Sequence, residues 1–384
     1  MKPIRVLSIF GTRPEAVKMA PVVRCLKRTD GIEALVCVTA QHRQMLDQVL
    51  DLFEIQPDLD LNLMQPDQSL AQLTANIFAS LDPVLADLKP DWVLVQGDTT
   101  TVMAAALLSY YHRIKVGHVE AGLRTGDKWQ PFPEEVNRQV ASVAADLHFA
   151  PTEWSRQNLL KENVPSSRIF VTGNTVIDAL HHVASQPPNR QTLELFEQLG
   201  LPEVDLPSKS LPRLVLVTAH RRENFGKPLE QICLALQELA EFYAGDIRIV
   251  YPVHLNPNVQ EPVYRLLGDV PWINLLPPLD YLPLVHLLKR TAVLLTDSGG
   301  LQEEAPGLGV PVLVLREVTE RPEGVEAGTV RLVGTQKEQI VAHTRRLLDD
   351  PVSHADMAQA INPYGDGYAA ERIVKALLEY GVEK

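Results

Sequence analysis

Short apolar runs alternate with longer helical patterns from one end of this 384-residue chain to the other. Most runs are rich in β-branched residues, apolar on both faces and separated from the next run by one helix. This pattern is typical of parallel strands that crossover helices cover on both sides. The predicted strands are residues 6–10, 34–39, 92–96, 116–119, 147–150 and 169–172 in the first half and 214–218, 247–251, 273–275, 292–296 and 310–315 in the second.

The alternation is interrupted in the middle of the chain, which predicts two domains. It stops after about Asp178, and residues 186–189 and 201–212 are rich in proline, serine and acidic side chains, as expected of a connection and its flanks. Another break, at residues 363–367, precedes a last helical pattern. We therefore expect an α/β fold of two Rossmann-like, doubly wound domains and a terminal helix, with boundaries at 1–178, 179–362 and 363–384.

Two helix starts are indicated by capping chemistry. Pro14 suits a first helical position after the turn at Gly11. Ser69, with Gln72 three residues later, matches a capping box. These signals place one helix directly after the first strand and another from about residue 70.

Charge excludes several kinds of partner. The chain carries 36 basic and 48 acidic residues, so its formal net charge is 36 − 48 = −12. Nucleic acids and anionic membranes need a basic face, so we expect neither as a partner. An anionic small molecule is compatible with this charge, because a few Arg and His side chains suffice to bind a diphosphate.

The cysteines and the apolar runs indicate a cytoplasmic protein. Cys25, Cys37 and Cys233 lie far apart and match no metal-binding or redox spacing, so we interpret them as small buried hydrophobic residues in a reducing compartment. The apolar run at residues 4–10 is too short for a signal peptide, and no stretch approaches the roughly 20 apolar residues of a membrane span.

Charged side chains follow several predicted strands in the first half. Arg13 and Lys18 come just after the first strand, in a turn and helix start that favour anions, although an ordinary turn explains them equally well. Asp98 and Glu120 each follow a strand directly. Asp98 could instead cap a helix. Glu120 has no routine structural role there, and ligands bind beyond the carboxyl ends of such strands.

Two more carboxylates, Glu134 and Glu135, stand at the start of a helix after Pro133. Acidic residues complement the helix dipole there, so a structural role is a strong alternative. Three or four carboxylates brought to one site would suit proton transfer, because their surroundings tune their pKa values. The first half therefore predicts acid/base chemistry.

Two histidines follow strands in the second half. His220 and Arg221 come after residues 214–218 and read as an anion site, with a solvated charged surface as the alternative. His254 comes after residues 247–251, where a single histidine is more often structural.

The most informative segment is residues 296–304, which run from a strand through a glycine turn into a helix. Its glycines would let the backbone approach a phosphate, and Ser298 adds a hydroxyl. Glu304 suits the two hydroxyls of a ribose, and Arg321 would complete a phosphate clamp. A tight turn with an acidic first helical turn is the alternative.

Several motifs are absent from the sequence. No G-x-G-x-x-G follows the first strand, so neither a nicotinamide nor a flavin cofactor is expected. No Walker A sequence, nucleophile elbow or metal-ligand cluster is present, so we expect no NTP hydrolysis and no metal.

Taken together, the motifs resemble those of the non-hydrolysing UDP-N-acetylglucosamine 2-epimerases. They occur in the family's order and span nearly the whole chain, which makes the resemblance specific although each motif alone is weak. The matching segments are residues 10–21, 97–99, 118–124, 133–138, 218–224 and 297–304.

The resemblance implies a GT-B-like fold with an active site in the cleft between two Rossmann-like domains, and a final helix that packs back on the first domain. It implies a cytoplasmic homodimer that interconverts UDP-GlcNAc and UDP-ManNAc without an added cofactor. It also implies that UDP-ManNAc feeds cell-surface polysaccharide synthesis.

The resemblance also assigns roles to residues. Elimination of UDP to 2-acetamidoglucal and its re-addition need proton-transfer groups and donors for the diphosphate. The implied catalytic set is Asp98, Glu120 and Glu134, with Lys18 and His220 in support. The implied UDP-binding set is Arg13, His220, Ser298, Gly299, Gly300, Glu304 and Arg321.

Bacterial members of the family also bind a second UDP-GlcNAc as an activator. The matching positions here are Gln41, His42, Gln44, Arg221 and His254; a polar turn is the alternative for the first three. Asp67 departs from the basic residue that some activated members carry in this segment, which argues against strong effector dependence.

Four alternatives stay open at the level of sequence. A hydrolysing 2-epimerase would release free ManNAc, and a related enzyme would act on a diacetamido uronic acid sugar nucleotide. A GT-B glycosyltransferase would need an acceptor. A UDP-sugar sensor would bind without turnover.

Overall fold

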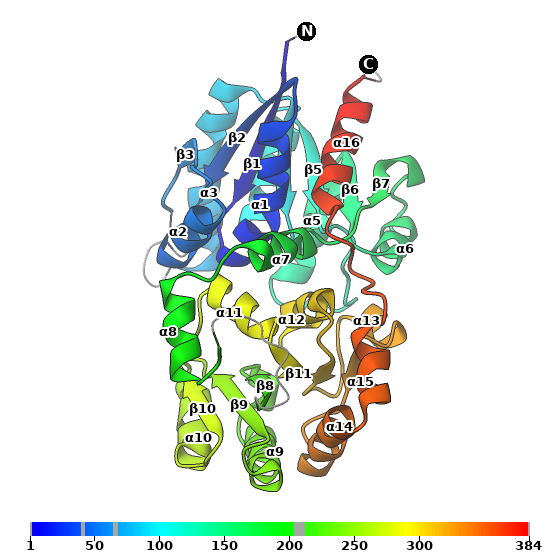
Figure 1. The fold of residues 1–384 in the computed structure, drawn as a ribbon. Helices are drawn as coiled ribbons and strands as arrows, with labels where there is room; N and C mark the ends of the chain where they lie inside the picture. Colours follow the sequence, from blue (N-terminus) through cyan, green and yellow to red (C-terminus); the bar gives the residue numbers. More distant parts are fainter. Residues whose placement is uncertain (1, 40–42, 64–67, 203–211, 383–384) are drawn as a thin grey trace. The chain divides into compact units, whose positions relative to one another are not determined.

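The structure, a computed structural model, describes residues 2–39, 43–63, 68–202 and 212–382 of the chain. It divides into two compact units, Met1–Ala179 with Tyr364–Lys384, and Leu180–Pro363 (Figure 1). The border between them falls inside helix α7 (Thr175–Ser185), ahead of the proline-rich stretch at residues 186–189. Both ends of the chain belong to the first unit.

The first unit is built on a parallel seven-stranded sheet in the order β3-β2-β1-β4-β5-β6-β7. The strand order reverses between β1 and β4, so a topological switch point lies at their carboxyl ends. Every side chain of β4 is buried, because helices cover both faces of the sheet. Its strands are β1 (Ile4–Phe10), β2 (Ile32–Val38), β3 (Leu59–Asp60), β4 (Trp92–Gln96), β5 (Lys115–Val119), β6 (Leu147–Ala150) and β7 (Ile169–Val171).

Two helices of this unit begin where capping residues in the sequence predict. Ser69 and Gln72 form the capping box expected at the start of α3, and Pro14 lies in the first turn of α1. The terminal helix α16 (Ala369–Val382) packs against α1 (Figure 1). The other helices are α1 (Arg13–Arg28), α2 (Arg43–Leu52), α3 (Leu70–Leu88), α4 (Thr100–Tyr111), α5 (Glu134–Ala144) and α6 (Glu153–Lys161).

The second unit repeats the plan with a parallel six-stranded sheet in the order β10-β9-β8-β11-β12-β13. Its switch point lies between β8 and β11. The main core packs β8 and β9 against helix α9 (Lys227–Tyr243) through buried Val215, Ile249 and Leu236. Its strands are β8 (Arg213–Thr218), β9 (Ile247–Pro252), β10 (Ile273–Leu276), β11 (Thr291–Thr296), β12 (Val312–Val314) and β13 (Val330–Leu332).

Two strands are additional to those expected from sequence. β3 and β13 pair only at the edge of their sheets, over two and three residues. Edge strands of this length carry no continuous apolar run, so periodicity does not reveal them. The remaining helices of the second unit are α8 (Arg190–Gln198), α10 (Pro257–Leu267), α11 (Tyr281–Leu288), α12 (Gly299–Glu304), α13 (Pro322–Glu326), α14 (Lys337–Asp349) and α15 (Pro351–Ala358).

The three cysteines are free. Cys37 and Cys233 are buried as expected, whereas Cys25 is only partly buried. In the part of the chain that the structure describes, no helix has the length and apolar character needed to cross a membrane.

Candidate functional site

A buried glutamate holds the turn after β1. Glu15 accepts hydrogen bonds from the backbone nitrogens of Gly11 (3.1 Å) and Thr12 (2.8 Å), forming a capping box with Thr12. Its other oxygen accepts from Thr99 Oγ1 at 2.8 Å. Burial raises the pKa of Glu15, and these hydrogen bonds oppose the rise. Glu15 thus joins the turns on either side of the switch point.

Glu120 directly follows β5, with a backbone φ of 61° in the left-handed region. Its two carboxylate oxygens lie 2.6 and 2.7 Å from Nζ of Lys18. It also accepts hydrogen bonds from the amides of Gln96 and, at 3.1 Å, of Asn174. An ammonium group and two amide NH₂ groups are all donors, so this site is built around a negative carboxylate.

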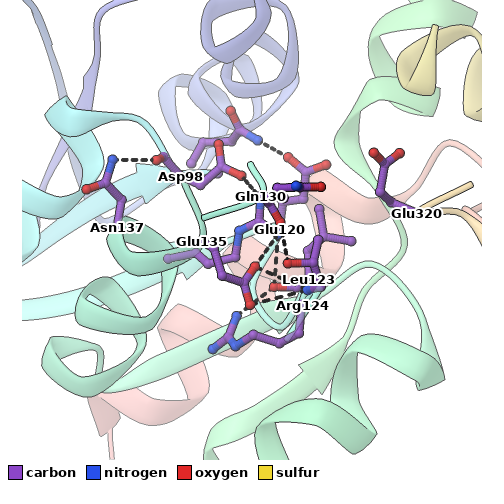
Figure 2. A network of polar contacts seen from close by, with 12 residues as sticks. Asp98, Glu120, Leu123, Arg124, Gln130, Glu135, Asn137 and Glu320 are labelled. Atoms are coloured by element: carbon purple, nitrogen blue, oxygen red, sulfur yellow. Dashed lines mark hydrogen bonds and ion pairs between the residues drawn. The ribbon is translucent and has the colours of Figure 1, made fainter. Parts of the chain in front are cut away.

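Asp98 follows β4 and pairs with a different cation. Its Oδ2 accepts from Nη2 of Arg138 at 2.5 Å. Its backbone oxygen accepts from the amide of Asn137 at 3.0 Å, as Figure 2 shows. Burial raises the pKa of Asp98; Arg138 opposes the rise and Glu120 adds to it. Asp98 and Glu120 therefore stand at adjacent strand ends in unlike surroundings, which is how carboxyl pairs divide acid and base roles.

Helix α5 begins with two glutamates that have different surroundings. Glu135 is fully buried and accepts from the backbone nitrogens of Thr125 and Gly126 and from Nη1 of Arg138. Glu134 is half-buried, and its carboxylate makes no hydrogen bond or ion pair with the residues that the structure describes. The structural role thus belongs to Glu135, whereas Glu134 is available for chemistry.

His118, on β5, supports the turn that precedes Asp98. Its Nε2 lies 2.7 Å from the backbone oxygen of Gly97, which can only accept, so Nε2 carries the proton. Burial lowers the pKa of His118 to about 4, which keeps the imidazole neutral. Gly97 has φ 81°, a conformation that glycine adopts without strain.

Buried Asp297 organises the switch point of the second unit. Its Oδ2 accepts from the backbone nitrogens of His220 and Arg221, both at 2.8 Å, and from the amide of Asn224 at 2.9 Å. Its Oδ1 lies 3.4 Å from Nδ1 of His220. Asp297 therefore fixes the loop after β8 from the end of β11.

The imidazole of His220 stacks on that of His254, with ring centroids 5.3 Å apart and planes 9° apart. Burial lowers the pKa of His220, while nearby Asp297 acts in the opposite sense. The stack joins a residue expected at the UDP site to one expected at the effector site.

The turn after β11 carries two glycines that have room for a side chain. Gly299 and Gly300 are the first residues of α12, directly after Ser298. A Cβ on Gly299 would lie 3.7 Å from Nη2 of Arg221, and one on Gly300 would lie 3.5 Å from Oε1 of Glu304. Both are ordinary contacts, so packing within the chain does not require glycine here. A ligand that approaches the backbone would require it.

Glu304 and Arg321 are each anchored by a neighbour. Oε2 of buried Glu304 accepts from the hydroxyl of Tyr281 at 2.8 Å. Nε of Arg321 donates to the carboxylate of Glu303, and the backbone nitrogen of Arg321 donates to Thr319 Oγ1 at 3.1 Å. Both expected ligand-binding side chains are thus held in place before any ligand binds.

The expected site residues fall into one group in each unit. In the first unit Lys18 contacts Glu120, Asp98 is close enough for Glu120 to raise its pKa, and Arg13 is the first residue of α1. In the second unit the expected residues stand at the ends of β8, β9, β11 and β12. Gln41, His42 and Asp67 lie outside the described residues, as does the side chain of Gln44.

Several residues of these sites were not expected from sequence. Gln96 and Asn174 follow the same rule as Glu120, since each stands at the carboxyl end of a strand. Thr12 stands three residues before Glu15, which is the spacing of a capping box, so the sequence carries a signal for this contact of Glu15. Asp297 and Arg138 lie within motifs but carry no sequence signal for the contacts that they make.

Among the described residues, no group of three or more His, Cys, Asp and Glu side chains is arranged to hold a metal ion. The donors in both groups are instead ammonium, guanidinium, amide and backbone N–H groups, which suit anionic ligands and carboxylates.

Comparison with known proteins finds close relatives over the full length. A family model described as UDP-N-acetylglucosamine 2-epimerase matches residues 24–378. The UDP-N-acetylglucosamine 2-epimerase of Escherichia coli O157:H7 is 58% identical over 374 residues, which are 97% of this chain and 98% of the relative. That of Salmonella typhimurium is 57% identical over 381 residues, covering 99% and 100%.

Solved structures agree with this result. The crystal structure of the Neisseria meningitidis UDP-GlcNAc 2-epimerase bound to UDP-GlcNAc matches with a TM-score of 0.88 and 50% identity, covering 98% of this chain and 100% of that one. The Methanocaldococcus jannaschii enzyme in complex with UDP-GlcNAc and UDP matches with a TM-score of 0.79 and 34% identity over 98% and 100%. These matches confirm the expected family and the GT-B-like fold class.

Proposed function

This chain belongs to the UDP-N-acetylglucosamine 2-epimerase family and is an isomerase of that kind, and from this premise we propose how it inverts C2 of the sugar. A C2–H beside an acetamido group is too weakly acidic for simple deprotonation. In the proposed reaction the C2 proton passes to an enzyme base as the bond from C1 to the UDP oxygen breaks, leaving 2-acetamidoglucal and UDP. UDP then adds back to C1 while a proton reaches the opposite face of C2.

The pair Asp98 and Glu120 is the observation that carries this proposal. They stand at adjacent strand ends, one beside Arg138 and the other beside Lys18. Proton transfer at both faces of C2 needs one carboxyl group that gives up a proton and one that accepts a proton. The unlike surroundings of Asp98 and Glu120 suit them to these different roles. We assign proton transfer to Asp98, Glu120 and Glu134, with Lys18 stabilising the cluster.

The second unit would bind UDP. Backbone N–H groups and the hydroxyl at Ser298, Gly299 and Gly300 would contact the diphosphate, since packing within the chain does not account for the two glycines. Glu304, oriented by Tyr281, would accept from the ribose hydroxyls.

Charge that builds on the departing diphosphate needs stabilisation. We assign this role to Arg13, His220 and Arg321. The imidazole of His220 lies beside Asp297 and the guanidinium of Arg321 pairs with Glu303, so both can act without reorganising during the reaction.

A second UDP-GlcNAc would act as an effector through Arg221 and His254, together with Gln41, His42 and Gln44. Support comes from the stack of His254 on His220, which gives an effector contact a direct route to a group at the diphosphate. We further propose a homodimer whose product supplies cell-surface polysaccharide synthesis.

Positional isotope exchange tests the elimination. UDP-GlcNAc labelled with ¹⁸O at the oxygen between C1 and the β-phosphorus is incubated with the enzyme. If the C1–O bond breaks and the β-phosphate of bound UDP rotates, the label spreads into the two non-bridging β-phosphate oxygens at a rate close to that of epimerisation. Label that stays in the bridge while UDP-ManNAc forms would contradict an intermediate in which the cleaved UDP turns within the site before it adds back.

A further inference from the structure

One donor to the carboxylate of Glu120 comes from the far edge of its sheet. Asn174 lies just beyond β7, two strands away from β5 in the sheet order, and its Nδ2 donates to Oε1 of Glu120 at 3.1 Å. Asn174 is 2% exposed. Together with Lys18 and Gln96, it determines where the Glu120 carboxylate sits.

The direction of the Asn174 amide is fixed by its second hydrogen bond. Oδ1 accepts from the backbone nitrogen of Val176 at 3.1 Å, at the start of α7. An N–H can only donate, so the oxygen of the amide must face Val176 and its NH₂ group must face Glu120. The NH₂ group of Asn174 thus donates to the carboxylate of Glu120 in a fixed direction.

The backbone of Asn174 is tied to a segment nearly two hundred residues away. Its nitrogen donates to the backbone oxygen of Tyr364 at 2.6 Å. Gly173 and Gly365 meet beside this bond, with φ values of 87° and 137°, and a Cβ on either would lie 3.3–3.4 Å from the Cα of the other. The absence of side chains on these two glycines therefore lets the two backbone segments approach this closely.

The same C-terminal segment is fixed again one turn further on. Asp178 accepts from the backbone nitrogens of Ala369 and Ala370, at 3.2 and 2.8 Å, and so caps α16. Arg372 donates to the backbone oxygen of Thr172 at 3.0 Å. Hydrogen bonds thus join residues 172–178 to residues 364–372 at several points.

We propose that Asn174 is a positioning residue for Glu120, and that the segment from Tyr364 contributes to the reaction through it. This inference rests on the proposed role of Glu120 in proton transfer. Misplacing a reacting carboxylate costs turnover while UDP binding, assigned to the second unit, is kept. The C-terminal segment would then affect the rate without contributing any group that touches substrate.

Asn174→Asp is the sharpest test, because it keeps the oxygen that accepts from Val176 and replaces the donor to Glu120 by an acceptor. We expect kcat to fall at least about 10-fold, with the Kd for UDP within about twofold of wild type. Asn174→Ala gives a second reading if the aspartate variant folds poorly. Asn158→Ala is the matched control: its amide donates to the backbone of Gly122 at 3.0 Å, near Glu120 but not to its carboxylate, and kcat should stay within about twofold.

Double variants separate positioning from general damage to the fold. In a Glu120→Gln background Asn174→Asp should cost no further activity, and the loss caused by Gly365→Ala should shrink when Asn174 is already replaced. A wild-type kcat in Asn174→Asp, or losses that simply add, would overturn the inference. If wild-type protein itself fails to epimerise UDP-GlcNAc, the proposed function is wrong instead, so the two failures are distinct.

Discussion

Nζ of Lys18 lies 2.6 and 2.7 Å from the two carboxylate oxygens of Glu120, and both side chains are largely buried. The lysine belongs to the helix after β1 and the glutamate to the end of β5, so the pair spans the switch point of the sheet. Glu120 therefore has a fixed position and a fixed charge partner before substrate arrives.

Lys18→Met should lower kcat at least about 10-fold and also lower the melting temperature, because the buried carboxylate of Glu120 loses the ammonium group that pairs with it. Lys27→Met is the matched control, since Lys27 is on the same helix and exposed. Steady-state kinetics and thermal unfolding measure both effects. Equal kcat values for the two variants would contradict the role of Lys18.

Asp98→Asn, Glu120→Gln and Glu134→Gln should each lower turnover at least about 100-fold, as expected when an acid/base group is removed. Their affinity for UDP, measured by calorimetry, should be nearly unchanged, since none of the three residues is assigned to UDP binding. Near-normal turnover in all three variants would show that the assigned proton-transfer set is wrong.

Neighbouring Glu134 and Glu135 should differ in kind. Glu134→Gln should lower kcat with little change in melting temperature. Glu135→Gln should lower the melting temperature, because the buried Glu135 carboxylate pairs with Arg138 and accepts from two backbone nitrogens. The same pair of measurements, turnover and thermal unfolding, tells the two apart; an unaltered melting temperature for Glu135→Gln speaks against its structural role.

Acid should destabilise the first unit through two buried histidines. Burial lowers the pKa of His118 to about 4 and of His148 to about 3, below the ordinary 6.5. Below pH 6.5 these histidines take up protons in the unfolded chain but not in the folded chain, so the free energy of unfolding decreases as the pH is lowered. The decrease is up to roughly 1.4 kcal/mol per pH unit for each histidine, until the pH reaches the pKa of that histidine in the folded chain.

Buried Glu15 and Asp98, whose pKa values are raised, act in the opposite direction at low pH, so a variant is needed to isolate the histidine. Urea unfolding of wild type and His148→Leu at about pH 7, 6 and 5 provides it. The free energy of unfolding of the variant should decrease less on acidification than that of wild type, by about the amount expected for the binding of one proton. Equal slopes would mean that His148 is not buried in its neutral form.

Tyr281→Phe should weaken UDP binding by about 10-fold, because it removes the hydroxyl that orients Glu304. The loss should be much smaller for 2′-deoxy-UDP, which lacks one of the ribose hydroxyls assigned to Glu304. Calorimetry with both ligands measures this difference. A loss of the same size for each ligand would place Glu304 away from the ribose.

Much of the fold follows from local sequence pattern. Strands β4 and β6 are buried along their whole length and mostly apolar, and their ends match the expected residues 92–96 and 147–150. The edge strand β3 pairs over two residues and leaves no such run. Strand ends also bring Asp98 and Glu120 together, because parallel strands place their carboxyl ends at one edge.

Contacts between distant segments are a different matter. In the sequence, neighbouring Glu134 and Glu135 are equally good candidates for a structural or a catalytic role. Only the packing of α5 distinguishes them, because it buries Glu135. The bond between Asn174 and Tyr364 depends on the C-terminal segment returning to the first unit. No periodicity or cap encodes such a contact, since it arises from tertiary packing.

The most direct test is a proton NMR time course of the purified protein with UDP-GlcNAc in deuterated water. We predict a mixture of UDP-GlcNAc and UDP-ManNAc in which deuterium enters at C2, because the proton removed from one face exchanges with solvent before the other face is protonated. Free ManNAc accumulating with UDP, or a spectrum that does not change, would contradict reversible epimerisation by this chain.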